Sequence, residues 1–271
     1  MKSGLGVFFA VVAALGASWT GFVVAPARQL GSAKLATVLV TGENWPQQRT
    51  GEATLGLQVY RANGCAACHT EQIRQAGTSF EVALVGVKKN AEAVSNLVSS
   101  LKLSGKLSGL NKDEADAAAT AITDAGGKVE TYISATGADI KRYNAVRRSV
   151  AADYLYDVPV QLGALRVGPD LANIGSRLAD AKVHLLHLYA PSAVVKNSAM
   201  PSFKFLFEVR KQVGSTPSAD ALNNLPKEFA PADGYEVVPK AEAKQLVAYL
   251  LTLRADAPLY EAPFTPATTK P

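Results

Sequence analysis

Both cysteines of the 271-residue chain and one of its three histidines fall within one short run, Cys65-Ala66-Ala67-Cys68-His69. Two cysteines separated by two residues and followed at once by a histidine form the attachment pattern of c-type haem. The two thiols add to the vinyl groups of the porphyrin, and the histidine ligates the iron. The run therefore predicts one covalently bound haem c, attached through Cys65 and Cys68, with His69 as an axial iron ligand.

Zinc binding and redox disulfide chemistry are the other uses of a Cys-x-x-Cys pair. A structural zinc site needs four ligands, usually including a second cysteine pair, and the sequence has no further cysteine. A dithiol oxidoreductase places its motif between a strand and a helix, whereas here a helical pattern leads directly into the motif. The sequence therefore favours haem attachment.

The second axial position of the iron has one thioether candidate. Apart from Met1, the only methionine is Met200, and Pro201 follows it. Methionine ligation raises the reduction potential and suits electron transfer, and the proline stiffens the loop that carries the sulfur. We expect Met200 to be the second axial ligand, although a lone methionine also serves as flexible core filler.

His184 and His187 are three positions apart and share one face of an expected helix. Two imidazoles without a nearby carboxylate or thiolate make a poor metal cage. We therefore expect structural hydrogen bonds from this pair rather than a second metal site or a replacement for Met200.

Residues 4–25 form an apolar stretch without a charged residue. At about 1.5 Å per residue, a helix of this length spans a hydrocarbon core of roughly 30 Å. A cleaved signal peptide is the alternative, because Ala25-Pro26-Ala27 has the small-x-small pattern of a cleavage site. The apolar run is longer than a usual signal core of about 7–15 residues, so we favour an uncleaved transmembrane anchor over residues 1–27.

Covalent haem attachment in bacteria takes place outside the cytoplasmic membrane, so we expect a single-pass protein whose haem domain lies in the periplasm. The net charge of +5 and the pI of about 9.1 suit an acidic partner or anionic lipid, without identifying either. No basic run is interleaved with aromatic residues, which argues against nucleic acid as a partner.

Two helices are expected to build the haem domain. One runs from about Glu52 to Asn63 and delivers the haem motif, and Pro239 opens another that ends near Leu253. Gly56 in the first would allow Tyr249 of the second to approach its backbone closely. We therefore predict a mainly α protein, with a class I cytochrome c-like domain formed by residues 51–74 and 153–254.

Three further segments surround this domain. Residues 28–50 are polar and interrupted by glycine and proline, as in a tether. Residues 75–152 contain no Cys, His, Met or Trp and include an alanine-rich pattern near 111–125, so we expect a helical insertion without redox chemistry. Residues 255–271 are rich in proline and threonine, which predicts a flexible tail.

Several short segments in a fixed order resemble one known family. Around the haem motif they are Val59-Tyr60 and Gly64-Cys65-x-x-Cys68-His69-Thr70-x-x-Ile73-Arg74. Later they are Tyr156-Asp157-x-Pro159-x-x-Gly163-x-x-Arg166-x-Gly168-Pro169-Asp170-Leu171, Ile174-Gly175-x-Arg177, His184-x-x-His187-Leu188, Pro191 and Ser198-x-Met200-Pro201. Together they resemble the mono-haem second subunit (FixO or CcoO type) of cbb-type haem–copper cytochrome c oxidases. The resemblance covers residues 52–74 and 153–207 and, in type, the N-terminal span.

The resemblance implies further roles. By analogy with related cytochrome domains, the carbonyl of Pro169 accepts the ring proton of His69 and orients the imidazole. Arg166 and Arg177 are candidates to neutralise haem propionates, the alternative being solvated surface charges. The chain departs from the family in having Val183 where a tryptophan is expected, and no aromatic residue near Leu162.

The function implied is that of a non-catalytic electron-transfer subunit, because an iron with histidine and methionine ligands has no open position. Its partners would be a catalytic haem–copper oxidase subunit, a dihaem cytochrome c subunit and the membrane. Three alternatives stay open: the haem c subunit of a nitric oxide reductase, a stand-alone anchored carrier, and an enzyme or gas sensor with a vacant haem position.

Overall fold

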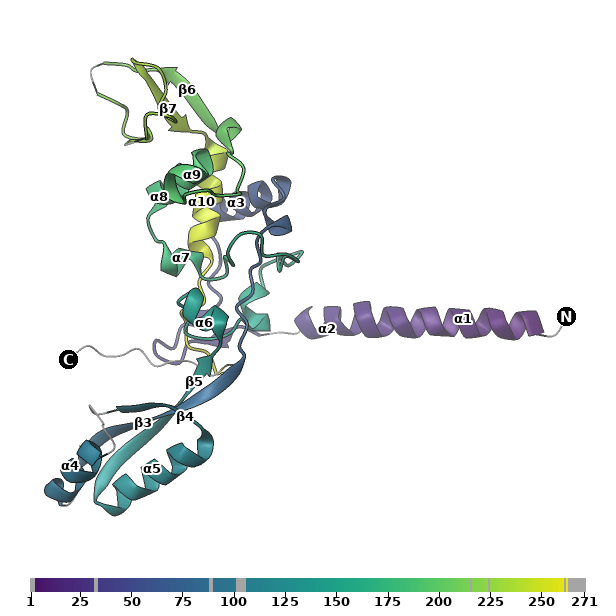
Figure 1. Ribbon diagram of the computed structural model, residues 1–271. Coiled ribbons are helices and arrows are strands. Elements are labelled where there is room, and N and C mark those ends of the chain that lie inside the picture. Colours follow the sequence, from purple (N-terminus) through teal and green to yellow (C-terminus); the bar gives the residue numbers. More distant parts are fainter. Residues whose placement is uncertain are drawn as a thin grey trace.

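The structure is a computed structural model, and it describes residues 3–31, 34–87, 90–100, 106–214, 216–223, 225–260 and 262. Figure 1 shows an elongated body from which one helix projects sideways. The hairpin of β6 and β7 forms one end of the body, and the sheet of β3, β4 and β5 forms the other. The packed helices lie between these ends.

The projecting helix is continuous from α1 (Ser3–Trp19) through a π-helical turn, η1 (Thr20–Val24), to α2 (Ala25–Gly31). Its stretch Gly4–Gln29 is long and apolar enough to cross a membrane, and none of its hydrophobic window is buried against the body. An apolar helix with no protein covering it is suited to a lipid environment. This geometry is consistent with the predicted anchor.

The body is organised around α3 (Gly51–Ala62) and α10 (Ala241–Thr252). Thr50 caps α3 by accepting a hydrogen bond from the backbone N–H of Ala53. The two helices touch at Gly56, where a Cβ atom would lie 1.9 Å from the carbonyl oxygen of Gln245 and 2.8 Å from Cβ of Tyr249. The close approach predicted between Gly56 and Tyr249 is therefore present.

Shorter elements complete this helical core. They are η2 (Cys65–Ala67), α7 (Ile174–Arg177), α8 (Ala181–Tyr189), α9 (Pro191–Val194) and η4 (Lys204–Leu206). The antiparallel hairpin of β6 (Phe207–Lys211) and β7 (Tyr235–Pro239) leads into α10. Pro239 thus ends a strand instead of opening the helix, which begins at Ala241 after Lys240 as N-cap.

The prediction of a helical insertion over residues 75–152 is wrong in part, because this segment contains a β-sheet as well as helices. It contains β3 (Gly77–Val87), α4 (Ala91–Ser100), β4 (Lys106–Leu110), α5 (Lys112–Asp124) and β5 (Gly127–Thr136). The strands form an antiparallel sheet in the order β4-β3-β5. The predicted alanine-rich helix is α5, which Asn111 and Glu114 start with a capping box. The fold is therefore mainly α with a mixed insertion.

The tether and the start of the tail also pack more closely than predicted. β1 (Ala36–Thr37) pairs with β2 (Asn44–Trp45), and Val38 forms a bridge with the buried Leu259. Residues 255–259 are thus fixed against the body, because apolar burial and backbone pairing replace solvent contact. Residues 261 and 263–271 of the predicted tail lie outside the described residues. Two further short helices, α6 (Ala138–Arg142) and η3 (Ala151–Tyr154), connect the insertion to the core.

Replacing Gly56 with alanine is expected to destabilise the body, because the added Cβ overlaps the backbone of α10 at Gln245. Overpacking of this kind costs about 1–3 kcal/mol or more. Gly51→Ala in the same helix is the matched control, since a Cβ there meets nothing within 4 Å. Thermal unfolding of the two variants should show a lower midpoint for Gly56→Ala alone. Equal midpoints would contradict the helix contact described above.

Candidate haem-binding site

The cysteine motif lies immediately after α3. Gly64 adopts a left-handed conformation with φ of +66° and ends the helix, and η2 then carries Cys65. Cys65 is half-buried, Cys68 is exposed, and both are free thiols. One short turn thus presents both sulfurs on the same stretch of backbone, as attachment to one porphyrin requires.

The surroundings of Cys65 do not resemble those of a redox dithiol. Burial raises the pKa of its thiol to about 11, whereas the attacking cysteine of an oxidoreductase has a lowered pKa. The motif follows a helix, not a strand. Among the described residues, no group of three or more His, Cys, Asp or Glu is arranged to hold a metal ion. Haem attachment therefore fits this motif better than either alternative.

The imidazole of His69 is held from two sides. Its Nδ1 lies 2.7 Å from the carbonyl oxygen of Pro169, so the contact predicted between these residues is present. A carbonyl oxygen only accepts, so Nδ1 donates its proton and Nε2 keeps a lone pair for a metal. A Cβ atom on Gly168 would lie 2.2 Å from Cε1 of the ring. Glycine is therefore required at this position, because any side chain would overlap the imidazole.

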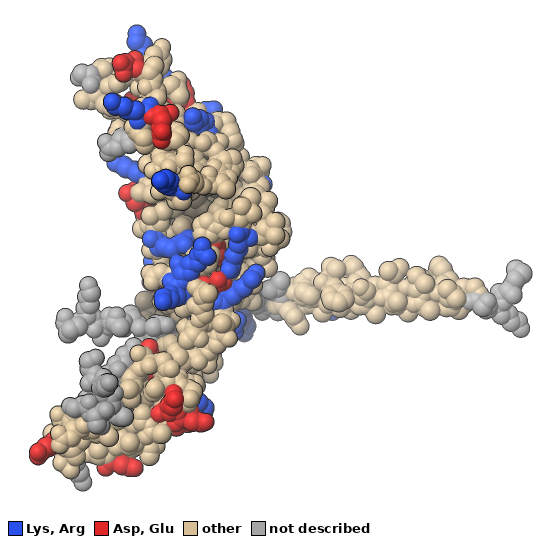
Figure 2. Space-filling model, viewed as in Figure 1, with Lys and Arg blue, Asp and Glu red and all other residues tan. Residues whose placement is uncertain are grey.

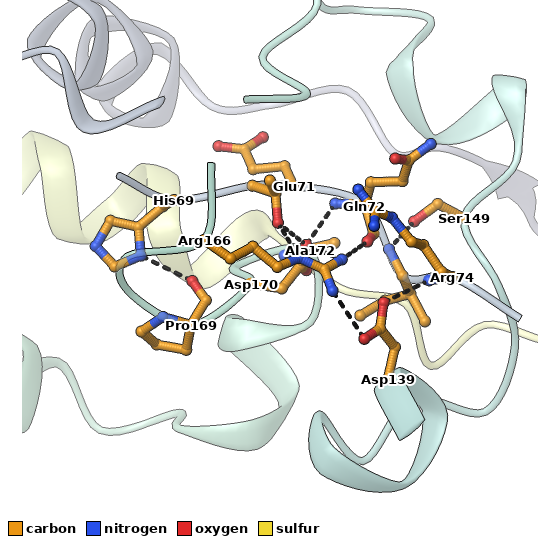
Figure 3. A network of polar contacts seen from close by, with 12 residues as sticks. His69, Glu71, Gln72, Arg74, Asp139, Ser149, Arg166, Pro169, Asp170 and Ala172 are labelled. Carbon is orange, nitrogen blue, oxygen red and sulfur yellow. Dashed lines mark hydrogen bonds and ion pairs between the residues drawn. The ribbon is translucent and has the colours of Figure 1, made fainter. Parts of the chain in front are cut away.

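A network of polar side chains fixes the segment that follows His69 to the segment that contains Pro169 (Figure 3). Asp170 is fully buried. One of its carboxylate oxygens accepts hydrogen bonds from the Thr70 hydroxyl at 2.5 Å and from the backbone N–H of Gln72 at 2.8 Å. The other accepts from the backbone N–H of Ala172 at 2.9 Å. These charge-assisted bonds hold the two segments in register.

Arg166 belongs to this network. Its guanidinium donates to Thr70, to Asp139, to the Gln72 carbonyl and to Asp170, at 2.6, 2.8, 2.6 and 3.2 Å. The hydrogen bond to Asp139 raises the pKa of Arg166. Figure 3 shows the side chain extending away from His69 toward Asp139. The geometry thus favours a structural role for Arg166 over the predicted contact with a haem propionate.

Arg177 has a different environment. It donates to the carbonyl oxygen of Asp170 at 2.9 Å and lies over the Tyr143 ring at 5.1 Å. Burial lowers its pKa, and its buried Nε has no hydrogen-bond partner among the described residues. An arginine without a carboxylate partner can pair with an added anion. The propionate role therefore remains a proposal for Arg177.

Met200 and Cys65 border the same apolar core. The buried part of this core includes Leu57, Tyr60, Leu188 and Leu250, and both sulfur-containing side chains pack against it. Haem is largely apolar and needs such a surface. The haem motif and the predicted axial methionine, which are far apart in the sequence, thus border one hydrophobic core.

The paired histidines both lie on α8. His184 is buried, and its Nε2 lies 2.8 Å from the carbonyl oxygen of Leu178. Burial lowers the pKa of His184 and of the half-buried His187. His184 therefore makes the structural hydrogen bond that the sequence suggested.

Sequence reasoning missed a buried carboxyl two residues after His69. Glu71 accepts hydrogen bonds of 2.9 Å from the Tyr249 hydroxyl at both oxygens, and burial raises its pKa to about 8. It borders a cavity of about 300 Å³ that is also lined by Arg49, whose guanidinium pairs with Asp157. A lone glutamate after the haem motif carries no pattern, so only the fold reveals this contact between the haem segment and α10.

Comparison with known protein families gives a match over part of the chain. Residues 131–244 match the model of the family described as cytochrome c oxidase, mono-heme subunit/FixO. The resemblance to FixO is confirmed. The FixO match begins in β5, ends in α10 and includes Pro169, Arg177 and Met200, whereas the cysteine motif precedes it. A comparison with curated proteins gives no match.

The FixO family is a family of mono-haem subunits of cytochrome c oxidase. One haem is consistent with the single cysteine motif of this chain.

Gly168→Ala is expected to displace the His69 imidazole, because the new Cβ would lie 2.2 Å from Cε1. Such overlap costs about 1–3 kcal/mol, so the yield of haem-loaded protein should fall and its optical spectrum should change. Gly86→Ala is the control, since a Cβ there meets nothing within 4 Å. A normal spectrum and yield for Gly168→Ala would contradict the placement of the ring.

Arg166→Leu is expected to destabilise the haem-loaded protein by about 2–3 kcal/mol, because it leaves the buried Asp170 without its cation. Lys112→Ala removes an exposed ion pair with Asp116 and should have no measurable effect. Chemical unfolding followed through the haem absorbance compares the two. An Arg166→Leu variant as stable as the wild type would show that the network does not hold the site.

Proposed function

We propose that this chain is a membrane-anchored, mono-haem c-type cytochrome that passes electrons to the catalytic subunit of a cbb-type cytochrome c oxidase. Its electrons would come from another cytochrome c or from a dihaem sister subunit. The anchor would hold the haem domain on the periplasmic side of the bacterial cytoplasmic membrane. The observation that carries the proposal is the His69–Pro169 contact, because it prepares Nε2 for iron within a chain that matches the FixO family.

Different residues of the site would hold different parts of the haem. Cys65 and Cys68 would form the two thioether bonds, and His69 and Met200 would occupy the axial positions. Arg177 is proposed to neutralise a propionate. A haem held by these residues would supply one-electron redox chemistry. The protein's part is to orient the imidazole, exclude water from the apolar side and set the potential.

Met200→Ala tests the axial ligation. Loss of the thioether should lower the reduction potential, because methionine ligation raises it, and should change the optical spectrum toward that of an iron with an open or water-filled position. Val209→Ala, at an exposed strand position, is the control. An unchanged spectrum in Met200→Ala would support the sensor or enzyme alternative, in which this position is vacant.

Co-purification tests the partner. The full chain, tagged and extracted from its own membranes in mild detergent, should elute with haem b, copper and oxygen-consuming activity. A bare eluate with haem c alone would indicate a free carrier. Haem b together with nitric oxide consumption would indicate a nitric oxide reductase, and either of these results would contradict the proposed oxidase.

A further inference from the structure

Three arginine side chains meet at one buried aromatic ring. Tyr143 follows α6 directly and is 3% exposed. The guanidinium carbon lies 5.1 Å from the centroid of its ring in Arg177, 5.7 Å in Arg166 and 5.8 Å in Arg142. A cation within about 6 Å of an aromatic centroid is attracted by the negative face of the ring. The Tyr143 ring is therefore a common contact of three cations.

The three arginines differ in what balances their charge. Arg166 forms ion pairs with Asp139 and Asp170. In the described part of the chain, the Arg177 guanidinium is held only by the Asp170 carbonyl and the Tyr143 ring, and its buried Nε has no hydrogen-bond partner. Burial, and to a smaller extent the charge of Arg142, lower the pKa of Arg177. The ring thus attracts a guanidinium that a neighbouring cation repels.

A buried asparagine fixes the ring relative to Arg177. Asn173 is fully buried, and its Nδ2 donates to the carbonyl oxygens of Tyr143 and Asn144 at 3.1 and 2.9 Å. Its Oδ1 accepts from the backbone N–H of Ala255 at 2.7 Å. Its own carbonyl accepts from the backbone N–H of Arg177 at 3.1 Å. The backbones that carry the ring and the guanidinium are therefore held together.

Arg177 is also fixed beside the residue that orients the imidazole. The Pro169 carbonyl holds Nδ1 of His69 at 2.7 Å, and the next carbonyl, that of Asp170, accepts from Arg177 at 2.9 Å. Figure 2 shows lysine and arginine side chains gathered over this part of the body, around α6 and α7. A positive charge held near the iron favours the reduced state, which carries one positive charge less.

We propose that Tyr143 is a positioning residue, whose ring holds the Arg177 guanidinium in place for a haem propionate and thereby raises the reduction potential. The inference rests on the proposed function, because it names the residue that places the proposed propionate cation. A planar guanidinium stacks on an aromatic face, so the ring fixes both the position and the orientation of this charge. Tyr143 would act on the potential only through Arg177.

Replacing the ring tests the inference by redox titration of haem c in the tagged full chain, extracted with its partners. Tyr143→Leu should lower the ratio of reduced to oxidised haem at a fixed potential about tenfold, which corresponds to about 59 mV for one electron. Tyr143→Phe keeps the ring and should titrate like the wild type. Tyr132→Leu is the control, because the Tyr132 hydroxyl bonds to Glu130 within the insertion sheet. It should leave the potential unchanged.

A double-mutant cycle separates an effect through Arg177 from a general disturbance of the site. Arg177→Leu alone should lower the potential, and adding Tyr143→Leu should lower it no further, because the guanidinium that the ring positions is already absent. A second fall of similar size in the double variant would overturn the inference. A wild-type potential in Tyr143→Leu, or in Arg177→Leu, would overturn it as well.

The outcomes separate the inference from the proposed function. A wild-type eluate without haem c or without haem b contradicts the proposed function itself, whereas a failed cycle in a haem-loaded oxidase complex overturns only the role of Tyr143. If Tyr143→Leu does not retain haem, pentafluorophenylalanine at position 143 decides the question, because it keeps the ring shape but loses the negative face. A potential below that of Tyr143→Phe supports the inference, and an equal potential overturns it.

Discussion

The hydrogen bond between the His69 imidazole and the Pro169 carbonyl is the constraint on which the site depends. The two residues are 100 positions apart, so the bond exists only if both segments are fixed in register. The buried Asp170 provides that register, because it binds Thr70 and Gln72 from the residue next to Pro169. A few fixed dipoles thus determine which ring nitrogen of His69 keeps a free lone pair.

The large insertion leaves this arrangement intact because its two ends meet. The backbone N–H of Ser149 donates to the Ile73 carbonyl at 3.0 Å, and the Ser149 hydroxyl accepts from the N–H of Ile73 at 3.0 Å. Ile73 also packs in a small cluster with Ile140 and Tyr143. A segment closed at its base adds little entropic cost to the domain that carries it. The haem segment therefore keeps its geometry although the mixed sheet extends from it.

The sequence was informative where local patterns determine structure. The alanine-rich pattern near residues 111–125 and the glycine at the α3–α10 contact are such signals, and they predicted α5 and the approach of Tyr249. The Pro169 contact was accessible only through the family resemblance. The axial role of Met200 stays a prediction, which rests on its being the one methionine of the chain besides Met1.

The remaining features depend on long-range pairing. The strands β3 and β5 pair Gly77 with Thr136, a contact that no local pattern specifies. A partial signal existed, since Phe80, Val82 and Leu84 alternate as in a half-buried strand, but the alanine-rich segment beside it favoured helix. The inward turn of Arg166 depends on Asp139, which belongs to the insertion, and was equally inaccessible from the sequence.

The most direct test of the central claim is the order in which the haems are reduced. In the purified complex, with the terminal site blocked by an inhibitor, rapid mixing with a reduced soluble cytochrome c should reduce the haem c of this chain before haem b. If this chain delivers electrons to the catalytic subunit, haem b reduction should follow haem c oxidation and should disappear in Met200→Ala. Reduction of haem b at the wild-type rate while this haem c stays oxidised would contradict the account.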